Sequence, residues 1–441
     1  MRAQYTPSPS PWTRWLTPHV WKQAHGVHTP KKSSRWDLHP LLLVLLLMTW
    51  TAGDSEAERF VTARAYYVAC HQHGKRPGRT LQGFQKALAK VPLPVLHAWF
   101  RAVRASLQQT FHRHWRTDGF VVLACDGTRL ECPRSAELER RLPGAGKPGS
   151  APTLYVTALV LLPAGLLWSW CVGPGTASEH DHLRSMLGRL PRRALLVADA
   201  FYQGYDLYTA LRQAGASFLV RLSSRSELFT ERRVPLDRFR EGLVWYWPRQ
   251  ARERERPPLR LRLLRVGGHR GRRPPVWLLT DVLEAGRLSR QRAAELYRWR
   301  WHAEGVFRAY KRTLPKVRLW NRTEALVYRE AEVALLGLQL VLAQAATKRR
   351  CDGRAVVVAG SARQQLLQIR GRVTTVVGAG LGPRQRRWYQ SRLARVQPGG
   401  GGRKVRRRWP RRKDHAAPQP PKIRVIPKDL KAKFKQHLKA A

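Results

Sequence analysis

Residues 297–311 read YRWRWHAEGVFRAYK. Within this segment a phenol, two cations and one carboxylate stand at offsets of 3, 7 and 14 residues from the first: Tyr297, Arg300, Glu304 and Lys311. Since an α-helix turns by about 100° per residue, these side chains would share an arc of about 60° on one helical face. The inward face of a structural helix is normally apolar. This face instead suits a group that holds a metal ion beside phosphates.

The flanking sequence favours a helix over residues 290–313. Ser289 is a suitable N-cap, the interior lacks proline and contains only Gly305, and Pro315 follows the end. The carboxylate of this helix would need further carboxylates to bind a divalent cation.

Two more carboxylates directly follow short apolar runs that are typical of buried strands. The run 119–125 (GFVVLAC) ends at Asp126, and the run 194–198 (ALLVA) ends at Asp199. An aspartate after a strand is more often a turn or cap residue, so neither position carries the argument alone. Their order relative to Glu304 is what supports interpreting them as metal ligands.

Between these strands lie a predicted hairpin (154–162 and 166–172) and a predicted helix (178–190). The element order is therefore strand with acid, hairpin, helix, strand with acid and, after a long segment, helix with acid. A ribonuclease H-like fold has this order, so we expect an α/β chain with such a core.

The three acids together with the spacing Y-x2-R-x3-E-x6-K resemble a DDE transposase of a bacterial insertion sequence, in the group called the IS-four family. The resemblance extends over residues 118–340. It implies that Asp126, Asp199 and Glu304 are the catalytic residues and bind two Mg²⁺ ions, which Mn²⁺ could replace. It also implies that Tyr297, Arg300 and Lys311 contact DNA near the cleaved end.

The activity implied by the resemblance is cleavage at the ends of an insertion sequence, followed by joining of those ends to target DNA. Its partners would be double-stranded DNA, as terminal inverted repeats and as target, and a second copy of the chain in the DNA complex. Two alternatives stay open at this stage. One is a ribonuclease H-like nuclease that cuts without joining, and the other is a DNA-binding derivative without catalysis.

We expect six regions along the chain. They are a helical DNA-binding region (1–116), the first part of the core (117–222), a β-rich insertion (223–275), the second part of the core (276–350), a helical region (351–397) and a flexible basic tail (398–441). In the insertion, Trp245 and Trp247 either stack on an unpaired base or pack the insertion against the core, and the sequence favours packing. Within the tail, a short amphipathic helix over 428–439 is compatible with the pattern.

Composition agrees with a polyanionic partner. The 441 residues include 82 Lys and Arg against 29 Asp and Glu, which gives a formal charge of +53. Such a surface binds duplex DNA with a steep dependence on salt. Arginine-rich composition can also arise from a GC-rich genome, and the basic tail could serve solubility alone.

Several other patterns are assigned to structure. The apolar run LLLVLLLMTW (41–50) is too short to span a bilayer, so we expect a buried helix and no membrane partner. The five cysteines form no CxxC pair, which suggests reduced thiols in the cytoplasm. The resemblance implies that this is a bacterial cytoplasm, with the protein near the nucleoid. The run 179–182 (EHDH) is interpreted as a helix start rather than a metal site. The segment 144–150 (GAGKPGS) lacks the first glycine and the final hydroxyl of a phosphate-binding loop, which excludes an ATP site.

Overall fold

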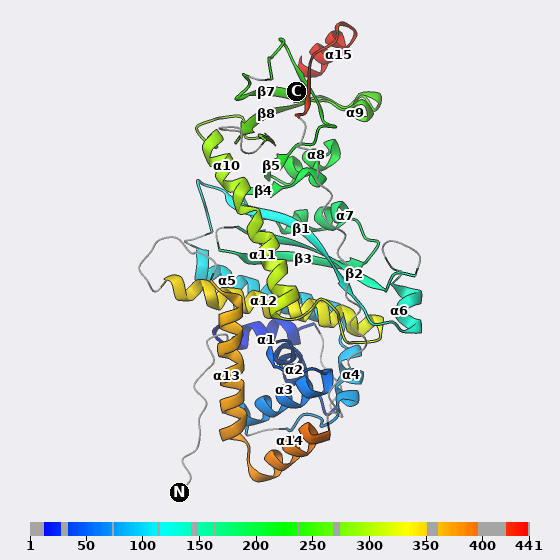
Figure 1. Ribbon diagram of the computed structural model, residues 1–441, viewed down its shortest axis with the longest axis vertical. Coiled ribbons are helices and arrows are strands. Elements are labelled where there is room, and N and C mark those ends of the chain that lie inside the picture. The colour runs from blue at the N-terminus through cyan, green and yellow to red at the C-terminus, as the bar shows by residue number, and fades with distance from the viewer. Residues whose placement is uncertain are drawn as a thin grey trace.

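The computed structural model describes residues 13–27, 34–72, 75–112, 115–142, 144, 149–162, 164–236, 238–267, 274–350, 360–395 and 420–439. These residues form a mixed α/β structure in which one large sheet lies against a helical bundle (Figure 1). The sheet has ten strands in the order β10-β6-β7-β8-β9-β5-β4-β1-β2-β3.

The half of the sheet that carries the predicted acids has the order β5-β4-β1-β2-β3. Its strands are β1 (Val121–Glu131), β2 (Thr153–Leu161), β3 (Leu166–Pro174), β4 (Ala194–Ala198) and β5 (Ser217–Arg221). β1, β4 and β5 are parallel, whereas β2 is antiparallel to both of its neighbours. The strand β4 is wholly apolar and buried, and the three central residues of β5 are apolar and buried, as expected for strands covered on both faces.

The segment between β5 and the third acid extends the same sheet. Its strands are β6 (Glu227–Thr230), β7 (Glu241–Tyr246), β8 (Leu259–Val266) and β9 (Val276–Thr280), with the short helix α9 (Arg249–Glu253) between β7 and β8. These strands are antiparallel to one another, and β9 pairs with β5. The predicted antiparallel insertion is therefore continuous with the core sheet.

The N-terminal side of the chain consists of helices. They are α1 (Pro18–His25), α2 (Leu38–Trp50), α3 (Glu56–Cys70), α4 (Leu81–Ala89) and α5 (Leu93–Phe111), preceded by the 3-10 turn η1 (Thr13–Trp15). The apolar run 41–50 belongs to α2, which is buried along its length, as predicted. Across the described ranges, no helix combines the length and apolarity that a bilayer span requires.

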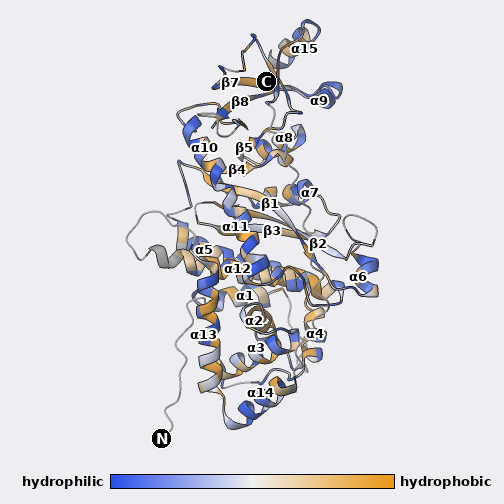
Figure 2. Cartoon of the chain, viewed as in Figure 1, coloured by the Kyte–Doolittle hydropathy of each residue, from blue (hydrophilic) through white to orange (hydrophobic). Residues whose placement is uncertain are grey.

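The other helices border the sheet or complete the bundle. Those beside the core strands are α6 (Ala136–Arg141), α7 (Glu179–Met186), α8 (Tyr205–Gln213), α10 (Arg290–Trp299) and α11 (Trp301–Arg308), with the short turns η3 (Leu187–Arg189) and η4 (Ala200–Tyr202). The bundle is closed by α12 (Glu324–Arg350), α13 (Ala362–Gly380) and α14 (Pro383–Arg395). Figure 2 shows that β4 and its neighbours are largely hydrophobic, whereas α14 is largely hydrophilic.

The C-terminal residues correct the prediction of a flexible tail over 398–441. Residues 422–425 form β10 (Lys422–Val425), which pairs in parallel with β6, and α15 (Lys428–Lys439) follows. The ring of Phe434 in α15 lies 4.9 Å from Trp245 and 6.1 Å from Trp247, measured between centroids. The apolar face of α15 therefore anchors this end of the chain, while the predicted basic stretch 398–419 lies outside the described residues.

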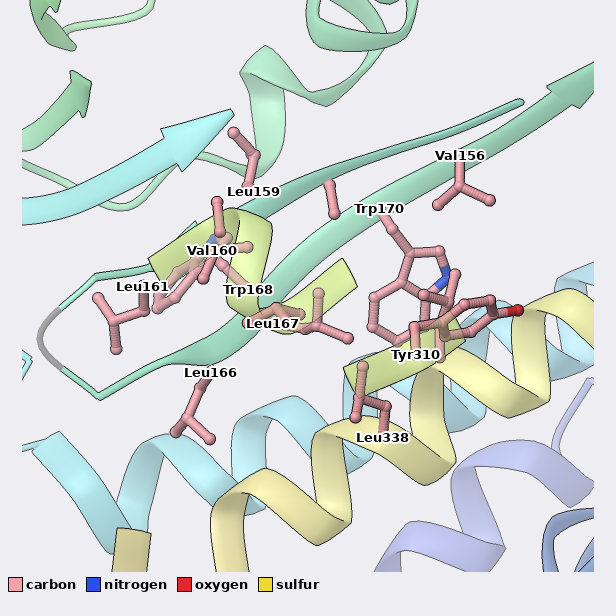
Figure 3. Close-up of a cluster of buried hydrophobic side chains, with 14 of the residues drawn as sticks. Val156, Leu159, Val160, Leu161, Leu166, Leu167, Trp168, Trp170, Tyr310 and Leu338 are labelled. Carbon is pink, nitrogen blue, oxygen red and sulfur yellow. The ribbon is translucent and has the colours of Figure 1, made fainter. Parts of the chain in front are cut away.

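A cluster of buried side chains joins the sheet to α12. Figure 3 shows residues of β2 and β3 packed with Leu338 of α12 and with Tyr310, which lies shortly after α11. The Tyr310 hydroxyl donates to the Ala331 carbonyl of α12 at 3.2 Å. Since each such buried side chain contributes about 1.5–3 kcal/mol, the cluster fixes the helix that carries Glu304 against the sheet.

Candidate active site

Asp126 and Asp199 lie at the same edge of the sheet. The parallel pairing of β1 with β4 runs to the pair Ala124 and Val197. Asp126 follows Ala124 by two residues, and Asp199 follows Val197 by two residues. Both aspartates therefore stand just beyond the carboxyl end of this pairing.

β1 does not end at Asp126, although the sequence predicts that it does. It continues to Glu131, because residues 123–131 pair with the antiparallel strand β2 after the parallel pairing with β4 has stopped. Asp126 is thus held inside a strand, and its Oδ1 accepts the Gly127 N–H at 2.9 Å. Asp199 follows β4 and caps η4, where its Oδ1 accepts the Phe201 N–H at 2.9 Å.

Glu304 is carried by a helical segment that begins as predicted. The Ser289 hydroxyl caps α10 by accepting the Arg292 N–H at 3.2 Å. The single helix predicted over 290–313 is instead divided into α10, α11 and a π-helical turn over Ala309–Thr313. At the first division, bonds from Arg300 N to Tyr297 O and from Ala303 N to Arg300 O span three residues, so the helix tightens locally.

Arg300 and Glu304 face each other across one turn. Arg300 Nη2 lies 3.4 Å from Glu304 Oε1, and the Arg300 side chain is largely buried. Its Nε is buried and has no hydrogen-bond partner among the residues described. A buried guanidinium N–H without an acceptor is costly, so this site is suited to an anionic ligand.

Tyr297 adjoins the pair formed by Arg300 and Glu304, and Lys311 does not. The Tyr297 ring centroid lies 5.8 Å from the Arg300 guanidinium carbon. Burial raises the pKa of Tyr297, and the negative charge of Asp199 adds to the rise, whereas the Arg300 guanidinium acts in the opposite direction. Lys311 falls in the π-helical turn, which changes the angular spacing of residues, and its pKa is lowered by burial. The predicted common face therefore holds for Tyr297, Arg300 and Glu304, but no described contact brings Lys311 to them.

A fourth carboxylate, Glu179, lies at this site. Its Oε2 accepts the Tyr202 hydroxyl at 2.6 Å. A Cβ atom at Gly127 would come within 2.7 Å of Glu179 Oε1, so the Glu179 carboxylate lies close to the backbone next to Asp126. Sequence reasoning missed Glu179 because it interpreted 179–182 as a helix start. That interpretation is correct for the backbone, since Ser178 caps α7. The neighbouring side chains do not join the site, because Asp181 pairs with Arg184 and His182 hydrogen-bonds to Thr157.

Burial and the neighbouring carboxylates raise the pKa of Asp126. Burial raises the pKa of Asp126 from 3.8 to about 6, and the charges of Glu179 and Glu304 add to this rise. The Gly127 N–H and the Arg300 guanidinium act in the opposite direction. Burial is also the main reason for the raised pKa of Glu179, to which the charge of Asp199 contributes. Asp126, Glu179, Asp199 and Glu304 are hereafter the carboxylate site.

The chemistry of the carboxylate site fits a hard divalent cation. Its oxygen ligands are those that Mg²⁺ prefers, and a cation would offset the cost of burying the Asp126 carboxylate and its repulsion by Glu179 and Glu304. Within the described ranges, however, no three His, Cys, Asp or Glu side chains are gathered closely enough to hold a metal ion. The predicted binding of metal by Asp126, Asp199 and Glu304 therefore stays a prediction.

The structure also bears on the interpretations made for the two tryptophans of the insertion, the cysteines and the segment 144–150. Trp247 is buried and donates to the Arg256 carbonyl at 2.7 Å, and Trp245 packs against Phe434, so both tryptophans serve packing. Cys125 is buried beneath the carboxylate site, as expected for a packing residue. Most of the segment 144–150 and Cys351 lie outside the described residues.

The chain is similar to known proteins in one family model and in solved structures. Residues 118–337, just under half of the chain, match the family model described as the transposase DDE domain. The matched range contains every member of the carboxylate site, and it supports a DDE transposase. No curated protein sequence matches the chain. Among solved structures, the chain is similar to a piggyBac transposase synaptic complex with hairpin DNA, with a TM-score of 0.42 and 10% identity, over 88% of this chain and 85% of that chain.

Proposed function

We propose that this protein is a DNA transposase of the insertion-sequence type, in the IS-four group, that cleaves the ends of its element and joins them to target DNA. The observation that carries the proposal is the position of Asp126, Asp199 and Glu304 inside the segment that matches the transposase DDE domain. The sheet order β3-β2-β1-β4-β5, with only β2 antiparallel, supports a ribonuclease H-like core for that segment.

The reaction would be an in-line displacement at a phosphodiester. Water attacks first and frees a 3′-hydroxyl, which then attacks a phosphate of the target. Two divalent cations held by Asp126, Asp199 and Glu304 would supply activation of the attacking oxygen and neutralise charge on the leaving oxygen. Mg²⁺ is the proposed cofactor, and Mn²⁺ would replace it.

The chain's own residues would orient the DNA. The Nε of Arg300, which has no hydrogen-bond partner within the described part of the chain, would provide a buried donor for a backbone phosphate beside Glu304. The Tyr297 phenol lies next to that guanidinium and would support the same phosphate. Lys311 would bind the strand at a longer range. Glu179 would hold Tyr202, and through it the loop after Asp199, in place.

The proposed partners follow from the charge and from the reaction. A formal charge of +53 favours duplex DNA, both the terminal inverted repeats and the target. Since two element ends must be joined together, we propose a homodimer on DNA. The proposed location is the bacterial cytoplasm, with the protein on the nucleoid.

The proposal is tested by incubating the purified protein with Mg²⁺ and a labelled duplex that carries the element's own terminal repeat. Asp126→Asn, Asp199→Asn and Glu304→Gln should each abolish nicking at the repeat boundary. Asp206→Asn is the matched control, because Asp206 is an exposed aspartate paired with Arg256. Equal nicking by wild type and Glu304→Gln would refute the assignment.

A further inference from the structure

A cleft between α5, β3, η3 and α12 lies apart from the carboxylate site, and its lining includes none of the four acids of that site. Its volume is about 80 Å³, several times the roughly 10–15 Å³ that one ordered water needs. Phe100, Trp168 and Trp170 form its apolar lining, and both tryptophans belong to β3 (Figure 3). The cleft therefore has room for a small molecule or for part of one.

Three guanidiniums line this cleft. Arg101 and Arg104 belong to α5, and Arg189 belongs to η3. The pKa of Arg104 is lowered, first by burial and then by the charges of Arg189 and Arg101, so the three cations lie close enough to repel one another. Arg104 and Arg189 donate to carbonyl oxygens of β3 at 3.4 and 3.3 Å, and these long bonds use few of the five N–H donors of each guanidinium. A phosphate group, with its charge and several acceptor oxygens, would relieve the repulsion.

The wall formed by α12 carries hydrogen-bond acceptors instead. Glu332 is buried, and its Oε2 accepts the Trp170 Nε1–H at 2.5 Å. Its Oε1 lies 3.6 Å from Nε2 of His97, the only ion-pair partner of Glu332 among the described residues. Gln339 donates through Nε2 to the Leu167 carbonyl at 2.7 Å, and its buried Oε1 has no partner in the part of the chain that the structure describes. Since a buried acceptor without a donor costs about 1–3 kcal/mol, this wall suits a donor group of a ligand.

We propose that this cleft binds a small phosphate ester that also carries a hydrogen-bond donor, a chemistry that sugar phosphates and nucleotides share. The phosphate binds Arg101, Arg104 and Arg189. A hydroxyl or amino group of the same ligand donates to Glu332 or Gln339 on α12. The apolar lining excludes water and so strengthens these charge-assisted hydrogen bonds. The site goes beyond the proposed function, because it shares no lining residue with the carboxylate site and needs no DNA.

Calorimetric titration of the full-length protein with small phosphates tests the proposal. The probes are ribose 5-phosphate, AMP and methyl phosphate, and methyl phosphate keeps the phosphate group while it lacks the additional donors. Adenosine is titrated as well, because it keeps the donors and lacks the phosphate. All titrations use one salt concentration, because salt screens the attraction between exposed charges.

Ribose 5-phosphate or AMP should bind at least about 10-fold more tightly than methyl phosphate and adenosine. Arg104→Gln and Arg101→Gln should each weaken binding of that ester by about 10- to 100-fold, because each removes a charge-assisted hydrogen bond. Arg101 is exposed, so its variant keeps the test valid even if Arg104→Gln disturbs β3. Arg249→Gln is the matched control, because it removes the same charge from an exposed arginine on α9 that pairs with Glu253, outside the cleft.

Equal losses in Arg101→Gln, Arg104→Gln and Arg249→Gln would overturn the proposal, because general attraction by a charge of +53 would then explain the binding. Binding of methyl phosphate as tight as that of both esters would also overturn it, since the donor would then contribute nothing. Tighter binding of AMP than of ribose 5-phosphate would identify a nucleotide as the ligand, and equal binding would identify a sugar phosphate. Nicking of the repeat boundary in Mg²⁺ is measured separately, so either proposal can fail while the other stands.

Discussion

Replacing Asp126 by asparagine should stabilise the folded protein at neutral pH and abolish its cleavage activity. Asparagine keeps the oxygen that accepts the Gly127 N–H, but it removes a negative charge from a buried position next to Glu179 and Glu304. A carboxylate that is costly in the metal-free protein is expected where function requires it to meet a cation.

The magnitude follows from the raised pKa of Asp126. Its folded pKa is about 6, against an ordinary value of 3.8. The folded state therefore binds more protons than the unfolded state between these values, and stability falls as pH rises through this window. The loss is complete above about pH 7 and amounts to about 3 kcal/mol, at about 1.36 kcal/mol per pH unit.

The assay is urea denaturation of wild type and Asp126→Asn in EDTA, followed at several pH values from about 4.5 to about 8.5. The variant should be more stable by about 3 kcal/mol at about pH 8 and by about half as much at about pH 5. Added Mg²⁺ should reduce the difference at the higher pH by stabilising only the wild type. A difference that does not change with pH, or a variant less stable than wild type at the higher pH, would refute the reasoning.

Three further predictions concern the supports of the site and the fold. Gly127→Ala should reduce cleavage with little change in stability, because the new Cβ would displace the Glu179 carboxylate and the Tyr155 hydroxyl, which are the ends of flexible side chains; unchanged cleavage would contradict this. Glu330→Ala should cost about 3–5 kcal/mol in urea denaturation, because it leaves Lys316 buried without its partner at 2.6 Å; a loss below about 1 kcal/mol would contradict it. Phe434→Ala should free α15 from the insertion and speed proteolysis of the C-terminal residues, and an unchanged rate of proteolysis would show that Phe434 does not anchor the helix.

Local sequence patterns predicted the elements that carry the proposed acids. Apolar β-rich runs before Asp126 and Asp199 identify the strands β1 and β4, because burial on both faces leaves a continuous hydrophobic run. Likewise, Ser289 marks the start of the helical segment before Glu304, since the cap is encoded by one residue.

Long-range contacts explain what the sequence did not reveal. Glu179 joins the carboxylate site only because α7 docks over Gly127, and no pattern within 179–182 encodes that contact. β1 continues past Asp126 because it pairs with β2, a strand that lies further along the sequence and is not visible in the local pattern around Asp126. The order of residues 422–439 depends on pairing with β6 and on contact with Trp245, whereas its basic composition alone is typical of a flexible tail.

The most direct test of the central claim is joining of pre-cut ends. A labelled duplex that ends in the terminal repeat with a free 3′-hydroxyl is incubated with wild-type protein, a supercoiled target plasmid and Mg²⁺. A transposase should attach the label covalently to the plasmid, and Glu304→Gln should not. Cleavage of uncut repeat ends by the wild type without any joining of pre-cut ends would contradict the account and identify the protein as a nuclease.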